Sequence, residues 1–251
     1  MDLEGQVAIV TGGSRGIGRS ISLAFAECGA SVVINYRKDA KSAEDVADEI
    51  RKKGRQAFLV SGDVSISHVA EMLMKETAQR FGRIDILVNN AGIASRGRFI
   101  QVTDIEEWNM VLSTNLYSVF NCSKAVLSYM RSSKNGNIIN ISSISARLLQ
   151  AGHGPYAVSK AGVEAFTKVL AKEEGPNGIR VNAIAPGIVK TDMGNRLMKA
   201  MGDDLVKETL SNTPLGRIAY PSDISNLAVF LVSDKASFIT GKIIHVDGGT
   251  I

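Results

Sequence analysis

Cysteine, aromatic residues and long apolar runs are all scarce in this chain of 251 residues. Its two cysteines, Cys28 and Cys122, lie in segments with a helical pattern, so we expect neither a disulfide framework nor a Cys-x-x-Cys metal site. A reducing compartment, the cytoplasm, follows as the predicted location. The apolar run from Leu227 to Val232 is too short to span a bilayer, and the residues from Met1 to Gly5 carry no basic flank, so no membrane association is expected.

Concentrated positive charge and clustered metal ligands are lacking as well. The 29 basic and 25 acidic residues are scattered without a Lys/Arg run, and aromatic residues, at 6%, form no stacking platform. We therefore expect no nucleic-acid partner. His68, His153 and His245 lie far apart in the sequence without ligand spacing, so no metal site is expected either.

What the chain does have is a regular succession of short apolar runs. They are almost continuously apolar, as is typical of strands buried on both faces of a parallel sheet. The seven predicted strands are Val7–Val10, Val32–Ile34, Ala57–Val60, Ile84–Val88, Ile138–Ile141, Val181–Ile184 and Ile243–Val246.

Helical patterns separate these strands. They cover residues 15–28, 41–53, 66–81, 104–131, 155–174 and 222–233. Alternating strands and helices predict right-handed crossovers, and hence a single α/β domain over residues 1–251. Its fold class is a Rossmann-type, doubly wound parallel sheet of about seven strands with helices on both faces. Only the stretch 187–216 interrupts the rhythm, and we expect it to be an irregular insertion that serves as a substrate lid.

A glycine-rich turn links the first predicted strand to the first helix. It reads Thr11-Gly12-Gly13-Ser14-Arg15-Gly16-Ile17-Gly18. Glycines at such a junction allow a tight turn and a close approach of the backbone to a pyrophosphate, and the helix N-terminus favours negative charge. The spacing G-x-x-x-G-x-G differs from the general G-x-G-x-x-G fingerprint. The turn therefore indicates dinucleotide binding, with a plain turn as the alternative.

The end of the second strand bears on which dinucleotide is bound. NAD-binding folds commonly place a carboxylate near this point, but here the residues are Asn35-Tyr36-Arg37. The guanidinium of Arg37, helped by Arg15, could pair with a 2′-phosphate. This favours NADP over NAD, the alternative being an Arg37 that only meets solvent.

Tyr156 and Lys160 lie four residues apart, so both side chains share one face of a helix. A nearby ammonium favours tyrosinate and would lower the phenol pKa toward neutrality, which suits proton exchange during turnover. A pair with this spacing also arises readily by chance. Its weight depends on the polar residues that accompany it.

Two further polar residues are candidates for the same site. Ser143 follows the strand Ile138–Ile141, at the edge of the sheet where open α/β folds bind ligands, although serine is also common in loops and caps. Asn115 interrupts a helical pattern in which asparagine is a poor helix former. It is either a solvated side chain or part of a hydrogen-bonded relay.

In order and spacing, these motifs resemble the short-chain dehydrogenase/reductase family over almost the whole chain. The motifs are Thr11–Gly18, Asp63-Val64, Asn89-Asn90-Ala91-Gly92, Asn115, Ser143, Tyr156-x-x-x-Lys160, Pro186-Gly187 and the segment His245–Gly249. The resemblance implies an oxidoreductase that transfers hydride between NADP(H) and a carbonyl or alcohol. Tyr156 would be the general acid/base, with Lys160 lowering its pKa, Ser143 binding the substrate oxygen and Asn115 completing a water relay.

The resemblance also implies the cofactor contacts. These are Gly12, Ser14, Arg15, Gly16, Ile17, Gly18, Arg37, Asp63, Val64, Asn90, Ala91, Gly92, Tyr156, Lys160, Pro186, Gly187, Ile188, Val189 and Thr191. Asp63 and Val64 match the adenine site of the family. Ile188, Val189 and Thr191 match residues that contact the nicotinamide amide.

Within the family the chain is most similar to 3-oxoacyl-acyl-carrier-protein reductases of fatty acid biosynthesis, with glucose 1-dehydrogenases second. The segment Val33–Arg37 resembles the latter. Carrier-protein reductases present two basic residues to an acidic partner: Lys134 matches one position, but Asn177 stands where the other is commonly arginine. A protein that binds the nucleotide without turnover is a remote alternative, because all four proton-handling positions are occupied. The family also implies a homotetramer built through the helices 104–131 and 155–174.

Overall fold

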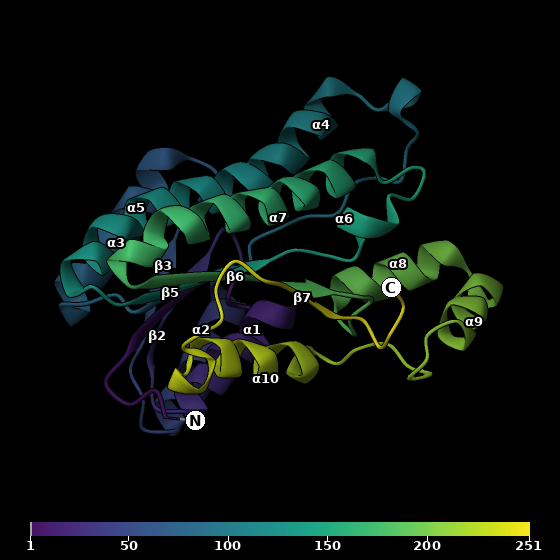
Figure 1. Cartoon of the computed structure of the whole chain (residues 1–251). Helices are drawn as coiled ribbons and strands as arrows, with labels where there is room; N and C mark the ends of the chain where they lie inside the picture. The colour runs from purple at the N-terminus through teal and green to yellow at the C-terminus, as the bar shows by residue number, and fades with distance from the viewer. Residues whose placement is uncertain (1) are drawn as a thin grey trace.

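The computed structural model describes residues 2–251 and places seven parallel strands in one sheet (Figure 1). The strand order is β3-β2-β1-β4-β5-β6-β7. The strands are β1 (Val7–Thr11), β2 (Ser31–Tyr36), β3 (Ala57–Ser61), β4 (Ile86–Asn89), β5 (Gly136–Ile141), β6 (Ile179–Pro186) and β7 (Ile243–Val246). All seven predicted strands and the fold class are therefore confirmed. The order reverses between β1 and β4, which is where such sheets bind ligands.

Helices cover both faces of the sheet (Figure 1). One layer contains α1 (Gly16–Glu27), α2 (Ala40–Lys52) and α10 (Pro221–Val232). The other contains α3 (Ser67–Phe81), α4 (Ile105–Leu112), α5 (Ser118–Ser133) and α7 (Gly154–Glu174). Each layer has its own core, because alternate residues of a strand point to opposite faces. On β1, Ala8 and Val10 pack toward α1 and α10, whereas Val7 and Ile9 pack toward α3 and α5.

The helical pattern from 104 to 131 is not one regular helix. A π-helical turn, Ser113–Tyr117, lies between α4 and α5 and contains the buried Asn115. Single π-turns within α-helices are frequent at functional sites. Periodicity alone predicts a continuous helix here, because a one-residue change of phase leaves the apolar pattern on either side intact.

The segment 187–216 is not irregular, and in this respect the sequence-based expectation was wrong. It contains two helices, α8 (Asp192–Met201) and α9 (Asp203–Ser211). Thr191 caps α8, since its hydroxyl accepts the N–H of Gly194 at 3.2 Å. The helical pattern is hard to recognise because Gly194 and Gly202 interrupt it, and glycine normally disfavours a helix interior.

A buried polar network ties the ends of β4 and β5 to the helices above them. The amide of Asn89 donates to the Asn140 side chain at 2.8 Å and to the Ser123 hydroxyl at 3.0 Å. The Asn140 amide in turn donates to Thr167 of α7 at 2.9 Å. Such fully buried bonds specify one arrangement of strand and helix. They fix α7 relative to the carboxyl ends of the central strands.

Candidate active site

The glycine-rich turn packs so closely that side chains are excluded at two of its positions. Gly12 has a φ of +61°, a backbone conformation that favours glycine. A Cβ on Gly18 would lie 2.3 Å from the carbonyl oxygen of Gly12 and 2.5 Å from Nδ2 of Asn90. The glycines therefore bring α1 against the end of β1, as the sequence predicts.

Hydrogen bonds hold this turn to the end of β4. The hydroxyl of Thr11 accepts the N–H groups of Asn90 at 2.9 Å and Ala91 at 3.0 Å. The amide of Asn90 donates to the carbonyl oxygens of Thr11 at 2.8 Å and Gly12 at 3.1 Å. Two of the predicted cofactor segments thus form one rigid unit.

The N-terminus of α1 is suited to an anion. Arg15 occupies the N-cap in an extended conformation, and no side chain within residues 2–251 caps this helix. Backbone N–H groups of the first turn are therefore available, and the helix dipole favours negative charge there. A dinucleotide pyrophosphate fits this glycine cradle and helix terminus.

Arg37 and Asp63, both predicted to contact the cofactor, pair with each other at 3.2 Å. Burial raises the pKa of Asp63, but hydrogen bonds from Ser65 and from Arg37 outweigh it, so the pKa lies below its usual value. Arg15 lies near the loop that follows Arg37. Its charge contributes, after hydrogen bonds from Ser42, to a lowered pKa of Asp39.

Ser143 lies between β5 and the short helix α6 (Ser145–Leu148). Its hydroxyl oxygen accepts the N–H of Ser145 at 3.2 Å. This bond uses only a lone pair of the oxygen, so the hydroxyl still has its proton to donate to another oxygen. Hydrogen bonding from Ser143 lowers the phenol pKa of Tyr156, while burial, the larger effect, raises it.

Lys160 lies one turn after Tyr156 on α7 and is 4% exposed. Its Nζ donates to the carbonyl oxygen of Ile141 at 2.8 Å and lies 5.8 Å from the centre of the Tyr156 ring. Burial lowers the pKa of Lys160 to about 8. The structure thus brings Ser143, Tyr156 and Lys160 together at the end of β5. The net pKa of Tyr156 nevertheless lies above its ordinary value, because burial outweighs the Ser143 bond.

Asn115 is fully buried in the π-turn, and its side chain is completely engaged. The amide oxygen accepts the N–H of Ile93 at 2.8 Å, while Nδ2 donates to the carbonyl oxygen of Ile93 at 2.9 Å and to Ser159 at 3.1 Å. A Cβ on Gly92 would lie 3.3 Å from Oδ1 of Asn115 and 3.6 Å from Nζ of Lys160. Gly92 therefore lies between the asparagine and the lysine.

The segment that follows β6 lies next to the glycine-rich turn. The N–H of Gly187 donates to Val246 at 3.0 Å, which anchors the segment to β7. A Cβ on Gly16 would lie 3.3 Å from the Thr191 methyl group. Thr191 thus reaches the start of α1, so the structure brings this predicted cofactor segment next to the glycine-rich turn.

Four buried polar residues around this site were not singled out from the sequence as functional. Ser159 receives the Asn115 amide, and Ser142 donates to Glu164 at 3.2 Å. Glu107 of α4 accepts the N–H of Arg96 at 2.5 Å, which holds the loop before α4. Only Glu164 had a usable signal, since it follows Tyr156 and Lys160 at the same four-residue spacing.

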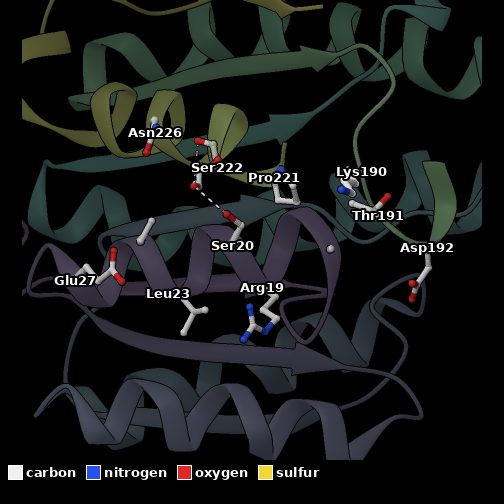
Figure 2. A pocket seen from close by; sticks show the side chains of 13 residues that line it. Arg19, Ser20, Leu23, Glu27, Lys190, Thr191, Asp192, Pro221, Ser222 and Asn226 are labelled. Carbon is white, nitrogen blue, oxygen red and sulfur yellow. Dashed lines mark hydrogen bonds between the residues drawn. The ribbon is translucent and has the colours of Figure 1, made fainter. Parts of the chain in front are cut away.

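A separate hollow of about 500 Å³ lies between α1, α10 and the segment from Lys190 to Asp192 (Figure 2). In its lining, the Ser20 hydroxyl donates to the Ser225 hydroxyl at 3.0 Å. The hollow borders Gly16 and Thr191, but it is lined by none of the four predicted catalytic residues.

Among residues 2–251, no group of three or more His, Cys, Asp or Glu side chains could hold a metal ion. No helix in this range is long and apolar enough to cross a bilayer.

Comparison with known proteins gives full-length matches. A family model described as enoyl-(acyl carrier protein) reductase matches residues 12–250. The 3-oxoacyl-[acyl-carrier-protein] reductase FabG of Staphylococcus epidermidis is 43% identical over 242 residues, which cover 96% of this chain and 97% of the relative. The 3-oxoacyl-[acyl-carrier-protein] reductase of Synechocystis is 40% identical over 250 residues, covering 99% and 98%.

A solved structure shows the same likeness in three dimensions. It is described as a candidate short-chain alcohol dehydrogenase from Sinorhizobium meliloti 1021. It superimposes with a TM-score of 0.94 at 38% identity, and the match covers 99% of this chain and 97% of the other.

Burial of Lys160 leads to a testable pH dependence of stability. The folded-state pKa of about 8 lies below the value of roughly 10.4 for an unfolded lysine. Between these values the unfolded chain binds more protons, so this group makes the folded state more stable as pH rises. In urea unfolding from about pH 7.5 to 9.5, wild type should therefore gain stability relative to Lys160→Met.

Lys168 is an exposed lysine on the same helix, and Lys168→Met is the matched control. Its difference from wild type should stay constant over this range, because the Lys168 side chain meets solvent in the folded and the unfolded chain alike. A Lys160→Met difference that is equally flat would contradict the buried, low-pKa lysine.

Proposed function

The chain belongs to the short-chain dehydrogenase/reductase family, and from this premise we propose that it reduces 3-oxoacyl thioesters, 3-oxoacyl-acyl-carrier-protein foremost, with NADPH. As a family member it is a nicotinamide-dependent oxidoreductase that acts on carbonyl or alcohol groups. The observation that carries the proposal is the convergence of Ser143, Tyr156 and Lys160 at the end of β5. Full-length relatives named for the thioester reaction support the choice of substrate.

The residues divide the proton chemistry among them. The Ser143 hydroxyl, whose oxygen already accepts an N–H, donates to the substrate carbonyl oxygen. The Tyr156 phenol transfers its proton to that oxygen as it becomes an alkoxide, and Lys160 stabilises the tyrosinate that results. When bound, NADPH supplies the hydride to the carbonyl carbon. The π-turn around Asn115 lies beside Lys160 and is the proposed start of the water relay that returns a proton to Tyr156.

The cofactor residues follow the same geometry. The pyrophosphate would lie on the glycine-rich turn and the α1 N-terminus, with the adenine near Asp63 and Val64. Arg37, assisted by Arg15, would meet the 2′-phosphate, and this supports NADPH over NADH. The segment from Pro186 to Thr191 would lie along the nicotinamide. We further propose that residues 187–216, with α8 and α9, close over the substrate as a lid.

Two positions would face an acyl carrier protein, and only one of them has a positively charged side chain. Lys134 is exposed at the end of α5 and has a φ of 49°, which turns the chain sharply there. Asn177 is neutral and its amide donates to Glu174 at 3.0 Å, so this position adds no positive charge to the surface. An acyl carrier protein would therefore be held by less positive charge than two basic residues provide.

A cytoplasmic location stays a prediction that accords with two free thiols.

The decisive experiment offers acetoacetyl-CoA to the purified protein with NADPH or NADH and follows cofactor oxidation. Turnover with NADPH is expected. If neither NADPH nor NADH is oxidised, the proposed thioester reaction is refuted. Tyr156→Phe is the control, since it should bind cofactor normally while turnover falls by about 10²- to 10⁴-fold. Glucose and other polyols are tested in parallel with NADP. Turnover of these alone would support the alternative, a sugar dehydrogenase, which the Val33–Arg37 segment favours.

Replacement of Arg37 tests the cofactor preference. In Arg37→Ala, the KM for NADPH should rise about 10- to 100-fold, the effect of losing a charge-assisted hydrogen bond of ~1.5–3 kcal/mol. The KM for NADH should change little, because NADH has no 2′-phosphate. Arg55→Ala is the control, since Arg55 pairs with Glu4 at 2.7 Å and lies outside the predicted cofactor contacts. Equal losses with both cofactors would rule out a 2′-phosphate role.

We also propose that the protein is a homotetramer. Large apolar side chains are exposed on α4, on α5, on α7 and in the π-turn, and exposed apolar surface on a folded protein can mark an interface. They include Ile105, Met110, Tyr117, Phe120, Val158 and Val169. Sedimentation should give four times the chain mass of 26.8 kDa, and Val169→Asp should give smaller species. A monomeric wild type would disprove the assembly.

A further inference from the structure

We propose that Glu164 is a positioning residue, which holds the Ser143 segment against α7 so that Ser143 meets Tyr156. This role deepens the proposed function and rests on it for its catalytic consequence. Glu164 lies on the turn of α7 that follows Lys160 and is 6% exposed. Tyr156, Lys160 and Glu164 therefore share one face of the helix, directed at the end of β5.

Both carboxylate oxygens of Glu164 are engaged by the segment that carries Ser143. Oε1 accepts the hydroxyl of Ser142 at 3.2 Å. Oε2 lies 3.2 Å from Nε of Arg147, which belongs to α6. Ser143 lies between these two attachment points. One side chain of α7 thus grips the chain immediately before the catalytic serine and one turn after it.

These contacts reach the Ser143 hydroxyl through a short path. The N–H of Ser145, at the start of α6, donates to Oγ of Ser143, so the position of α6 sets the direction of this hydroxyl. On the N-terminal side of Ser143, the carbonyl oxygen of Ile141 accepts a hydrogen bond from Nζ of Lys160. Segment 141–147 is therefore joined to α7 by Lys160 at its beginning and by Glu164 further along.

The energetics make Glu164 difficult to replace. A buried carboxylate is stable only when it is paired and hydrogen-bonded, and here Ser142 and Arg147 satisfy it. An apolar side chain would leave the Arg147 guanidinium without this partner, and the Ser142 hydroxyl with the carbonyl oxygen of Lys160, at 3.3 Å, as its remaining acceptor. The segment could then shift relative to α7, and a displacement of about 1 Å in a reacting group can lower a rate by roughly 100-fold.

The test compares Glu164→Leu with Glu164→Gln and Ser142→Ala. With acetoacetyl-CoA and NADPH, Glu164→Leu should lower kcat by about 10- to 100-fold and leave the KM for NADPH close to wild type. Glu164→Gln keeps an acceptor for Ser142 and should stay within about fivefold of wild type, since an ion pair with a half-exposed arginine contributes little. The double variant Ser142→Ala/Glu164→Leu should be no slower than Glu164→Leu alone, because residues that act as a unit are not additive.

Glu174 provides a matched control at the far end of the same helix. It is 1% exposed and pairs with Arg131, so Glu174→Leu also removes a buried carboxylate from a half-exposed arginine. It should lower the thermal midpoint as Glu164→Leu does and leave kcat unchanged. If the two variants have the same kcat, Glu164 has only a structural role and the proposal is wrong.

A second readout does not require turnover. The bond with Ser143 lowers the phenol pKa of Tyr156, so displacement of Ser143 should raise it. An NMR titration with ¹³Cζ-labelled tyrosine, assigned by comparison with Tyr156→Phe, should show a higher midpoint in Glu164→Leu but not in Glu174→Leu. If Glu164→Leu fails to fold, Ser142→Ala is titrated instead and should shift in the same direction. An unshifted midpoint would overturn the proposal, whereas wild type that does not reduce acetoacetyl-CoA would refute only the proposed substrate.

Discussion

The bond between Nζ of Lys160 and the carbonyl oxygen of Ile141 is the contact around which the candidate catalytic centre is organised. A lysine that is almost fully buried needs a partner for its charge, and a backbone carbonyl at the end of a central strand provides one. This bond fixes the face of α7 that meets the sheet. Tyr156, on the same face, must then lie next to the chain that leaves β5, which is where Ser143 is located. The Asn89–Asn140–Thr167 network fixes the same helix two turns further along.

The fold could be predicted because its determinants are local. The central strands are buried on both faces and have an almost continuously apolar sequence, and the partly buried edge strands β3 and β7 keep short apolar runs, so all seven were recognisable without tertiary information. Where other determinants act, the prediction was incomplete. Glycines concealed the helices α8 and α9, and the π-turn at Asn115 keeps the apolar pattern on both sides while changing its phase. No periodicity argument distinguishes that turn from a regular helix.

The candidate site divides in a similar way. Thr11–Gly18, Ser143, Tyr156 and Lys160 were accessible from sequence because they combine reactive groups with a recognisable position at a strand end or on one helix face. Ser159 and Glu107 were not, since they act through hydrogen bonds between elements that are distant in the chain, and for Glu164 the sequence offered only its spacing after Lys160. The direction of the pKa shift of Tyr156 could not be predicted from the sequence either. Charge alone suggests a lowered value, but the depth of burial, which only the folded structure supplies, raises it.

The π-turn sets which face of α5, the helix that follows it directly, points into the core. Each residue added to or removed from a helix rotates the succeeding part by about 100° about the axis. A deletion that restored regular α-helix at Ser113–Tyr117 would therefore turn the 16 residues of α5 as a block. Cys122, Val126 and Met130 would leave the core, and polar neighbours would replace them. Insertions and deletions in this stretch are thus constrained by the packing of the entire helix as well as by Asn115, and homologous chains should vary here by substitution far more readily than by length.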